Sequence, residues 1–470
     1  MSIEMTQGIW GSIAAAGEPR SQLARELVKE LDTGLRVLDQ MSPAVTFFGG
    51  ARVSKDDPYY AAAERMGELL ADAGIAPRTG AGPGIMSAVP EGFRRQLGVE
   101  KGSTNLGVRK IGEGPQPLTQ GFNIILPFEQ EVNPAIDLSM ELGHFPTRKL
   151  MLYQNCLGLV IFPGGFGTLD ELLEVWRLKA SGSLTFPVIL YGSDFWAPFK
   201  EALERAHEGL PELAIGKDWL GLLQCSDCPA ETIEMITSQK SVAPRENLFE
   251  LGHRIARELV EGLDYLDRLA PAVTVLGGSR FRDESHFVEK AGEMAAYLAS
   301  HGTPTRAAGP GPLSVALARG GHRGQEHLPQ QAFGMRRDDA RNLYGADRVH
   351  LVGDRLTHKV LLTEGSKALV AFPGSLGTLD ELFSILCQLQ TRTVSNRRIV
   401  LIGESFWTPI LEVIKAQMFE GDRQTISAED LDLMTITDDP LEAAKLALTP
   451  PEELSKKMAR GVYEEPQVDK

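Results

Sequence analysis

The chain has 470 residues, and 43% of them are hydrophobic and 24% charged, which is typical of a globular protein and excludes a long disordered or fibrous chain. Acidic residues number 63 and basic residues 48, so the net charge of −15 excludes a strongly cationic surface for nucleic acid or anionic membranes, although a local cationic pocket for a small phosphate remains open. Four cysteines are too few for a disulfide framework and favour a reducing, cytoplasmic location.

The predicted elements alternate between helices and buried strands. The N-terminal segment lacks a basic start and a long apolar core, and no stretch reaches the length of a membrane span, so we expect neither a secretory signal nor a transmembrane helix. An amphipathic helix around ARELV precedes the apolar run 45–48, and 59–73 reads as a helix with Ala63, Met66, Leu69 and Leu70 on one face, closed by Gly74. The runs 157–162 and 187–191 are typical of buried strands. We therefore predict an α/β fold with a Rossmann-like parallel sheet and helices on both faces.

The chain contains an internal repeat. PAVT begins at position 43 and again at 271, an offset of 228, whereas the FPG of FPGGFGTLDEL at 162 recurs at 372 as FPGSLGTLDEL, an offset of 210. The first copy is thus longer by 18 between these landmarks, and we place the extra length in a loop insertion around 100–135. ARELV at 24–28 also recurs, at 256–260, but its distance to PAVT differs by about one helical turn.

Two copies explain the length better than three unrelated domains. We predict one unit over 1–235 and a second over 236–470, because a Pro-containing segment breaks the pattern near 225–245. Cys225 and Cys228 in this segment have no further ligands nearby at zinc-binding spacing, so we interpret them as ordinary thiols and predict no metal site.

The segment PGGFGTLDE directly follows a buried strand. Gly164, Gly165 and Gly167 allow a ligand to approach the backbone, and the start of the following helix, where we expect Thr168 as the N-cap, favours an anion such as phosphate. An alternative is purely structural, because Thr168 and Glu171 also have the spacing of a capping box.

The segment TGAGPGIM, which contains Gly80, Gly82, Gly84 and Met86, lies between a short strand and a helix. It matches neither GxGxxG nor a Walker loop, so a tight turn without a ligand remains an alternative. The basic pair Arg148-Lys149 precedes the strand at 157. On a helix the two side chains point about 100° apart, so one is expected to face a pocket and the other solvent, and a solvated pair remains open as well.

These motifs together resemble the LONELY GUY (LOG) family, the group long labelled "possible lysine decarboxylase". The resemblance covers residues 45–196 and rests on GGxR at 49–52, TGAGPGIM, LPFEQEVNP at 126–134, TRK at 147–149 and PGGFGTLDE. It implies a Rossmann-like fold and a phosphoribohydrolase, which cleaves nucleoside 5′-monophosphates, cytokinin ribotides among them, to free base and ribose 5-phosphate.

The resemblance also implies roles for individual residues. Arg148 and Glu171 match the catalytic pair, and the residues implied in substrate binding are Gly50, Gly82, Gly84, Met86, Lys149, Gly164, Gly165, Gly167 and Thr168. A carboxylate suits this chemistry, because loss of the base leaves a positively charged, oxocarbenium-like ribose. The scheme needs no metal and no cofactor, and nothing in the sequence supports a decarboxylase with a Schiff-base lysine.

The second copy departs from the pattern. Gly165 is replaced by Ser375 and Arg148 by His358, while Thr378 and Glu381 keep their places; Arg355, one turn earlier, is a candidate substitute for the lost arginine. Histidine lacks the charge constancy and fork geometry of arginine. We interpret the second copy as a degenerate LOG-like unit that is structural or binds a nucleotide as a regulator.

Several hypotheses follow for the whole chain. The leading one is a nucleoside-monophosphate phosphoribohydrolase in the first copy; the alternative is a non-catalytic nucleotide-binding or sensing protein, and a dinucleotide oxidoreductase is disfavoured by the absent fingerprint. LOG-type domains form dimers, so the resemblance implies an internal pseudo-dimer, with a homo-oligomer of the whole chain left open. The preferred base is not specified by the sequence.

Overall fold

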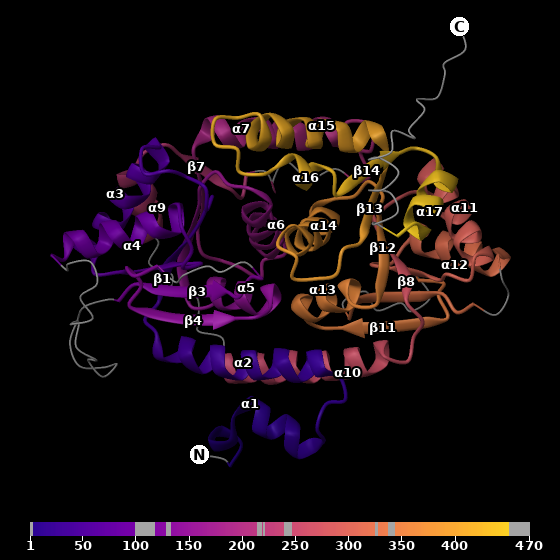
Figure 1. Ribbon diagram of the computed structural model, residues 1–470, viewed down its shortest axis with the longest axis horizontal. Coiled ribbons are helices and arrows are strands. Elements are labelled where there is room, and N and C mark those ends of the chain that lie inside the picture. Colours follow the sequence, from indigo (N-terminus) through magenta and orange to yellow (C-terminus); the bar gives the residue numbers. More distant parts are fainter. Residues whose placement is uncertain are drawn as a thin grey trace, which may run out of the picture.

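The computed structural model describes residues 3–98, 118–127, 133–213, 219, 221–238, 247–324, 328–336 and 344–450. Within these ranges the chain forms two seven-stranded sheets, one from each copy, with helices packed around them (Figure 1). The neighbouring strands pair in parallel. The predicted Rossmann-like α/β fold, duplicated in tandem, is confirmed.

The strand order of the first sheet is β4-β3-β2-β1-β5-β6-β7, and the second sheet repeats it as β11-β10-β9-β8-β12-β13-β14. The first sheet consists of β1 (Ala44–Phe48), β2 (Ala76–Thr79), β3 (Gln120–Ile124), β4 (Leu138–Leu142), β5 (Cys156–Ile161), β6 (Val188–Tyr191) and β7 (Gln224–Ser226). The second consists of β8 (Ala272–Leu276), β9 (Thr305–Ala307), β10 (Gln331–Met335), β11 (Arg348–Val352), β12 (Ser366–Ala371), β13 (Arg398–Ile402) and β14 (Met434–Thr437). The order reverses between β1 and β5 and between β8 and β12, which is where ligands bind in open parallel sheets.

Helices of the first copy are α1 (Ile3–Ala16), α2 (Gln22–Gln40), α3 (Pro58–Ala73), α4 (Ile85–Gln96), α5 (Phe145–Tyr153), α6 (Phe166–Ala180), α7 (Ser193–His207) and α9 (Pro229–Thr237). Those of the second are α10 (Leu248–Leu266), α11 (His286–Ser300), α12 (Pro312–Gly324), α13 (Arg355–Thr363), α14 (Leu376–Gln390), α15 (Glu404–Ile414), α16 (Ala428–Leu431) and α17 (Pro440–Leu448), with a π-helical turn η2 (Lys415–Phe419). Among the helices in the described ranges, none is both long and apolar enough to cross a bilayer.

Helix α3 shows how local sequence sets an element. Asp57 caps its start by accepting a hydrogen bond from the Tyr59 amide, and Pro58 occupies the first turn, where a missing N–H costs nothing. The helix ends at Gly74, whose φ of 68° is the left-handed conformation that glycine adopts readily. The predicted apolar face is buried in the core, apart from a partly buried Leu69.

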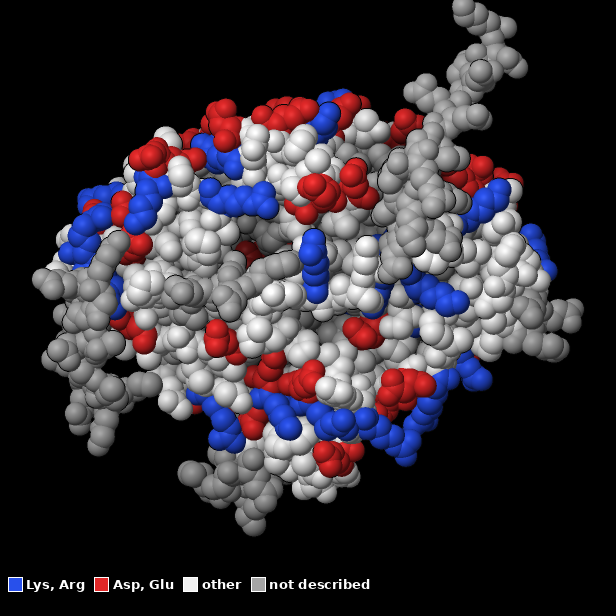
Figure 2. Space-filling model, in the orientation of Figure 1, with Lys and Arg blue, Asp and Glu red and all other residues white. Residues whose placement is uncertain are grey.

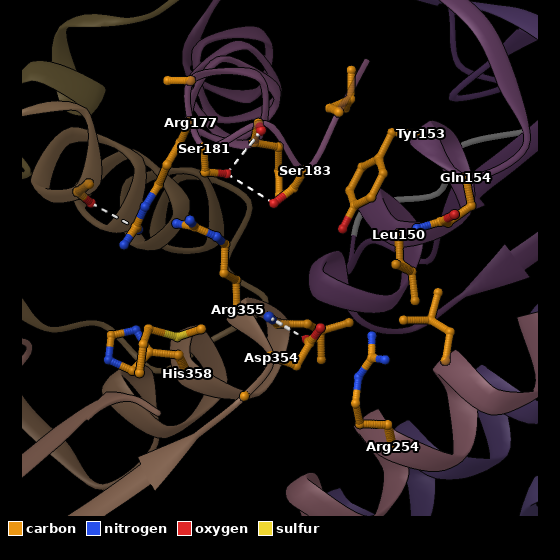
Figure 3. A pocket seen from close by; sticks show the side chains of 18 of the residues that line it. Leu150, Tyr153, Gln154, Arg177, Ser181, Ser183, Arg254, Asp354, Arg355 and His358 are labelled. Atoms are coloured by element: carbon orange, nitrogen blue, oxygen red, sulfur yellow. Dashed lines mark hydrogen bonds between the residues drawn. The ribbon is translucent and has the colours of Figure 1, made fainter. Parts of the chain in front are cut away.

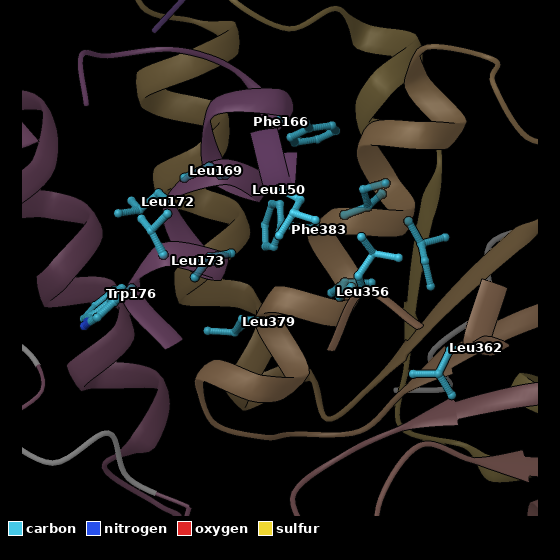
Figure 4. Packing of buried hydrophobic residues seen from close by; sticks show 14 of the residues in the cluster. Leu150, Phe166, Leu169, Leu172, Leu173, Trp176, Leu356, Leu362, Leu379 and Phe383 are labelled. Carbon is cyan, nitrogen blue, oxygen red and sulfur yellow. The ribbon is translucent and has the colours of Figure 1, made fainter. Parts of the chain in front are cut away.

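The two copies face each other through equivalent helices. Helix α2 packs against α10, α5 against α13, α6 against α14 and α7 against α15, as in a two-fold dimer in which the same surface is used twice (Figure 1). Leucines and aromatic residues of α6 and α14 fill the centre, where the rings of Phe166 and Phe383 lie 5.9 Å apart (Figure 4). Each large apolar side chain buried there stabilises the fold by about 1.5–3 kcal/mol.

The helix that opens each copy aligns differently from the sequence prediction. Glu30 on α2 accepts a hydrogen bond from the Gly143 amide, and Glu258 on α10 accepts one from the Gly353 amide. Glu30 and Glu258 are therefore equivalent, at the same offset as the PAVT segments. The two ARELV segments are a chance match one turn out of register, and the apparent difference in length disappears.

Two further predictions fall partly outside the described residues. The insertion of the first copy lies between α4 and β3, where residues 99–117 are not described. Helix α9 ends at Thr237 and α10 begins at Leu248, with 239–246 outside the described residues. The division of the chain at residue 235 stays a prediction.

Charges on the face shown in Figure 2 are mixed. Basic and acidic side chains are interspersed over this face, as expected from a sequence that has 48 basic and 63 acidic residues. Among the described residues on this face, acidic side chains interrupt the basic ones, so no extended cationic area of the kind that binds a polyanion is formed there.

Candidate active site

Three loops meet at the carboxyl edge of the first sheet. The loop after β1 contacts the loop after β5, since the Gly50 amide donates to the Pro163 carbonyl at 2.9 Å. The Ile85 amide, at the start of α4, donates to the Gly50 carbonyl at 3.2 Å. The structure thus brings together the glycine segments that the sequence singled out.

Two glycines in these loops are required by close approach. Gly84 has a φ of 67°, and a Cβ there would lie 2.2 Å from the Gly50 carbonyl oxygen. A Cβ on Gly164 would lie 2.1 Å from the Thr168 hydroxyl. Gly82 lies beneath the thioether of Met86, which also covers Gly80. A side chain at Gly84 or Gly164 would therefore collide with the neighbouring loop or with Thr168.

Arg148 reaches this edge from α5. Its Nε donates to the Phe122 carbonyl at 2.9 Å, and its guanidinium lies directly against Gly80, where a Cβ would come within 2.0 Å of Nη2. The Arg148 Nη1 lies 3.5 Å from the Glu171 Oε1, and both side chains are mostly buried. The predicted catalytic pair is therefore assembled beside the glycine loops.

Glu171 is not a helix cap. Helix α6 begins earlier than predicted, with Gly165 as N-cap and no side chain capping it, so Thr168 lies inside the first turn. The capping-box alternative is wrong because both of its residues are already helical. Burial raises the pKa of Glu171 to about 7, although Arg148 opposes the shift; Asp170 adds to it. This carboxyl group therefore changes its charge near neutral pH.

The second copy covers the first copy's glycine loop. The Thr425 hydroxyl donates to the Gly164 carbonyl at 3.3 Å, and a Cβ on Gly165 would meet the Thr425 carbonyl at 2.8 Å. In return, His207 of the first copy lies with Nε2 3.0 Å from the carbonyl of Gly374, the counterpart of Gly164. Each glycine loop thus contacts the other copy. A Cβ on Gly167 would lie 3.7 Å from the sulfur of Cys387.

Lys149 points into the interface rather than to the substrate side or to solvent. Its ammonium lies 2.8 Å from Asp170 and 2.7 Å from Glu174, and it is 3% exposed. Burial alone would lower the pKa of Lys149, but the surrounding carboxylates raise it well above its usual value. The placement does not support the predicted role in substrate binding.

A buried charge cluster joins the copies at this point. Lys359, the counterpart of Lys149, lies 2.8 Å from Glu174 and 2.5 Å from Asp380. The carboxylate oxygens of Asp170, Glu174 and Asp380 lie within 4.8 Å of one another, close enough for a metal ion, but two lysine ammoniums already occupy the space among them. We interpret the cluster as an ion-pair network.

The equivalent edge of the second copy is built differently. Arg177 crosses from α6 and places Nη1 3.1 Å from the Glu381 Oε1 and 3.0 Å from the Asp380 Oδ2. His358 Nδ1 lies 3.5 Å from the same Glu381 oxygen. Burial would raise the pKa of Glu381, but Arg177 and then His358 hold it below its usual value. Glu381 is thus fixed as a carboxylate, unlike Glu171.

Sequence reasoning missed Arg177. The offset of the FPG segments makes Cys387 its counterpart, so each copy sends a residue at this position to the other copy's loop, and only one of them is charged. The repeat alignment does show an arginine opposite a cysteine at this position. Recognising that Arg177 reaches the second copy also requires knowing that α6 and α14 face each other.

Comparisons with known proteins give one family and several solved structures of low similarity. The model of the family described as "possible lysine decarboxylase" matches residues 100–236 and 327–447, just over half of the chain and part of each copy. Among solved structures, a molybdenum cofactor binding protein from the phototrophic bacterium Rippkaea orientalis is 18% identical, over 43% of this chain and 98% of that one, with a TM-score of 0.31. The molybdenum cofactor carrier protein of Chlamydomonas reinhardtii is 18% identical over 42% of this chain and 97% of that one, with a TM-score of 0.26. No curated protein sequence matches the chain.

Proposed function

Since the chain belongs to the LOG family, whose model is described as "possible lysine decarboxylase", we propose that its first copy hydrolyses the N-glycosidic bond of nucleoside 5′-monophosphates. The products are a free base and ribose 5-phosphate. The observation that carries the proposal is the Arg148–Glu171 pair, 3.5 Å apart, buried beside glycine loops at the carboxyl edge of a parallel sheet.

The glycine loops suit the 5′-phosphate. Helices α4 and α6 both begin at this edge, with Gly84 and Gly165 as N-caps and no side-chain oxygen capping either helix. Backbone N–H groups and the helix dipole at such starts favour an anion. A phosphate held there positions the sugar and fixes the scissile bond relative to Glu171.

Glu171 suits the bond-breaking step. As the base leaves, positive charge develops on the ribose, and a carboxylate in a poorly solvated position stabilises that charge strongly. The same carboxylate can accept a proton from the attacking water, because its pKa of about 7 lies near the working pH. Arg148 holds the carboxylate in place and lowers the fraction that is protonated.

The lysine decarboxylase label finds no support at this site. A Schiff-base lysine must be available as a neutral amine. Lys149, which adjoins Arg148 in the chain, is held in ion pairs with Asp170 and Glu174, and its pKa is raised well above the usual value. The residues beside Glu171 do not fit that chemistry.

The experiment is a substrate panel. The full chain is incubated with ribo- and deoxyribonucleoside 5′-monophosphates, and free base and ribose 5-phosphate are measured by chromatography. Base release from at least one monophosphate, with the unphosphorylated nucleoside a much poorer substrate, is expected. Binding of monophosphates without base release would instead favour the second candidate, a non-catalytic nucleotide-binding protein. The second copy already shows the equivalent glutamate, Glu381, held in an ion pair with Arg177.

A further inference from the structure

A large cavity lies at the second copy's equivalent of the catalytic edge. Its volume is about 1030 Å³, and both copies line it. The second copy contributes the loops after β8 and β9 and the start of α14, while α5 and α6 of the first copy contribute Tyr153 and Arg177 (Figure 3). Ligand pockets in proteins typically measure about 300–1,000 Å³, so the space suits a molecule of nucleotide size.

The cations around this cavity are not those of the first copy. Arg355 stands where the first copy has Phe145, which packs against Ile124 and Cys387 in a small apolar cluster. Arg177 enters from the other copy at the position that Cys387 holds in the first site. The second site thus lacks the arginine equivalent to Arg148 but has Arg355 and Arg177, which the first site lacks. It carries a different set of cations and has not simply lost them.

The arginines converge on the open space. Figure 3 shows Arg177, Arg254 and Arg355 extending toward the cavity from α6, α10 and the start of α13. Planar guanidinium groups of this kind pair with phosphate oxygens in a two-pronged manner. On the first copy's side, Leu150 and Tyr153 offer an apolar wall against which a base or similar ring can lie.

The carboxylates that line the cavity already have partners. Asp32 is paired with Arg36 at 2.8 Å, and Asp354 caps α13 by accepting a hydrogen bond from the Leu356 amide. Glu381 is held by Arg177 at 3.1 Å. Asp39, near the end of α2, is the remaining carboxylate of the lining. Arg36 and Arg177 therefore offset the charges of Asp32 and Glu381, so these two carboxylates oppose an anionic ligand less than unpaired charges would.

We propose that this cavity is a second ligand site, which binds a nucleoside phosphate without cleaving it. The phosphate lies against Arg355 and the start of α14, and Arg254 faces it from α10. Glu381 does not act on the sugar, because Arg177 holds it in an ion pair at 3.1 Å and the His358 ring lies 3.5 Å from the same oxygen. The site stands independently of catalysis in the first copy.

The test measures binding stoichiometry. The full chain carrying Glu171→Gln, which is expected to slow turnover at the first site strongly, is titrated with AMP, GMP, CMP and UMP by calorimetry, with inorganic phosphate as a further probe. We expect two binding sites per chain for at least one nucleotide and no base release from it.

Variants then assign the second site. Arg355→Phe, which installs the residue of the first copy, and Arg254→Ala, on the exposed surface of α10, should each weaken the second binding event at least tenfold and leave the first unchanged. Arg65→Ala, an exposed arginine remote from the cavity lining, is the matched control and should change neither. Nucleotide binding that neither Arg355→Phe nor Arg254→Ala weakens, or no binding at all beyond a site that both variants leave intact, overturns the proposal. Failure of wild-type base release alone would count against the proposed hydrolase and not against this site.

Discussion

Glu171 and Glu381 occupy the same position in the two copies, yet the pKa values of their carboxyl groups are shifted in opposite directions. Glu171 faces Arg148 at 3.5 Å and has a pKa raised by burial to about 7. Glu381 lies 3.1 Å from Arg177, and the pKa of Glu381 stays below its usual value. The carboxyl group of Glu171 thus changes its charge near neutral pH, while that of Glu381 stays ionised there.

Replacing the proposed catalytic carboxylate should abolish most of the activity. Glu171→Gln keeps the shape of the side chain but removes the charge that stabilises the ribosyl cation, so kcat should fall by about 10²–10⁴-fold. Base release from the best monophosphate measures it, with circular dichroism confirming the fold. Glu234→Gln, the same change at an exposed position of α9, is the control. Wild-type turnover in Glu171→Gln would contradict the assignment.

The pH profile should carry the signature of Glu171. If the ionised form is the active one, kcat/KM rises with pH through a midpoint near 7 and levels off above it. The phosphate of the substrate also titrates, near pH 6, so the profile is compared with the pH dependence of binding to Glu171→Gln. A midpoint of the kcat/KM profile near pH 4.5 instead would show that the Glu171 carboxyl group is well solvated.

Stability should depend on the same group. The native pKa of Glu171, about 7, exceeds its ordinary value of 4.5, so the native state binds more protons between these pH values and the free energy of unfolding falls as pH rises through this window. The loss amounts to at most about 3 kcal/mol. Urea unfolding at pH 5 and pH 8 should show this decrease in the wild type and a smaller one in Glu171→Gln.

Glu381→Gln is the matched comparison for this slope. The native pKa of Glu381 is lowered, so its stabilising contribution is present above the ordinary pKa of glutamate and is lost as pH falls. The penalty for Glu381→Gln should therefore be largest at neutral pH and shrink in acid. Equal pH trends in the two variants would show that the copies do not differ as described.

The buried charge cluster predicts a large penalty for removing one lysine. Lys359→Met keeps the length of the side chain but leaves Glu174 and Asp380 with less compensation, which should cost about 3–5 kcal/mol of unfolding free energy. The exposed pair of Arg65 and Glu68 provides the comparison, where Arg65→Ala should cost less than about 1 kcal/mol. Similar small costs in both variants would argue against a network that holds the copies together.

Two glycines with nearly the same φ separate backbone strain from steric conflict. Gly74→Ala places a Cβ in open space, so only the left-handed conformation is penalised, by about 1–2 kcal/mol. Gly84→Ala adds a contact of 2.2 Å with the Gly50 carbonyl and must displace the loop after β1. It should lower both stability and kcat/KM further than Gly74→Ala. Equal effects would mean that the loop adjusts freely.

Much of the fold could be predicted from sequence because its signals are local. Apolar runs such as 157–162 and the helix ending at Gly74 need no knowledge of tertiary contacts, and both are confirmed. The meeting of Arg148 and Glu171 was predicted by family resemblance. The start of α6 was misplaced, because Thr168 matches the pattern of a cap while Gly165 takes that position.

What sequence could not give was the environment across the interface. Helical geometry correctly separates the directions of Arg148 and Lys149, but it does not say whether the second direction meets solvent or another copy. Lys149 meets carboxylates there, two of its own copy and Asp380 of the other. Arg177 was overlooked for the same reason, since its partner Glu381 lies far along the chain, in the other copy.

The pairing of each helix with its own duplicate has an evolutionary consequence. In an assembly of identical subunits, one codon change alters both symmetry-related pockets at once. In a single polypeptide that holds both copies this constraint is absent, and position 177 is arginine while the equivalent position 387 is cysteine. The two equivalent sites can then diverge within one gene, each shaped by a residue encoded in the opposite half.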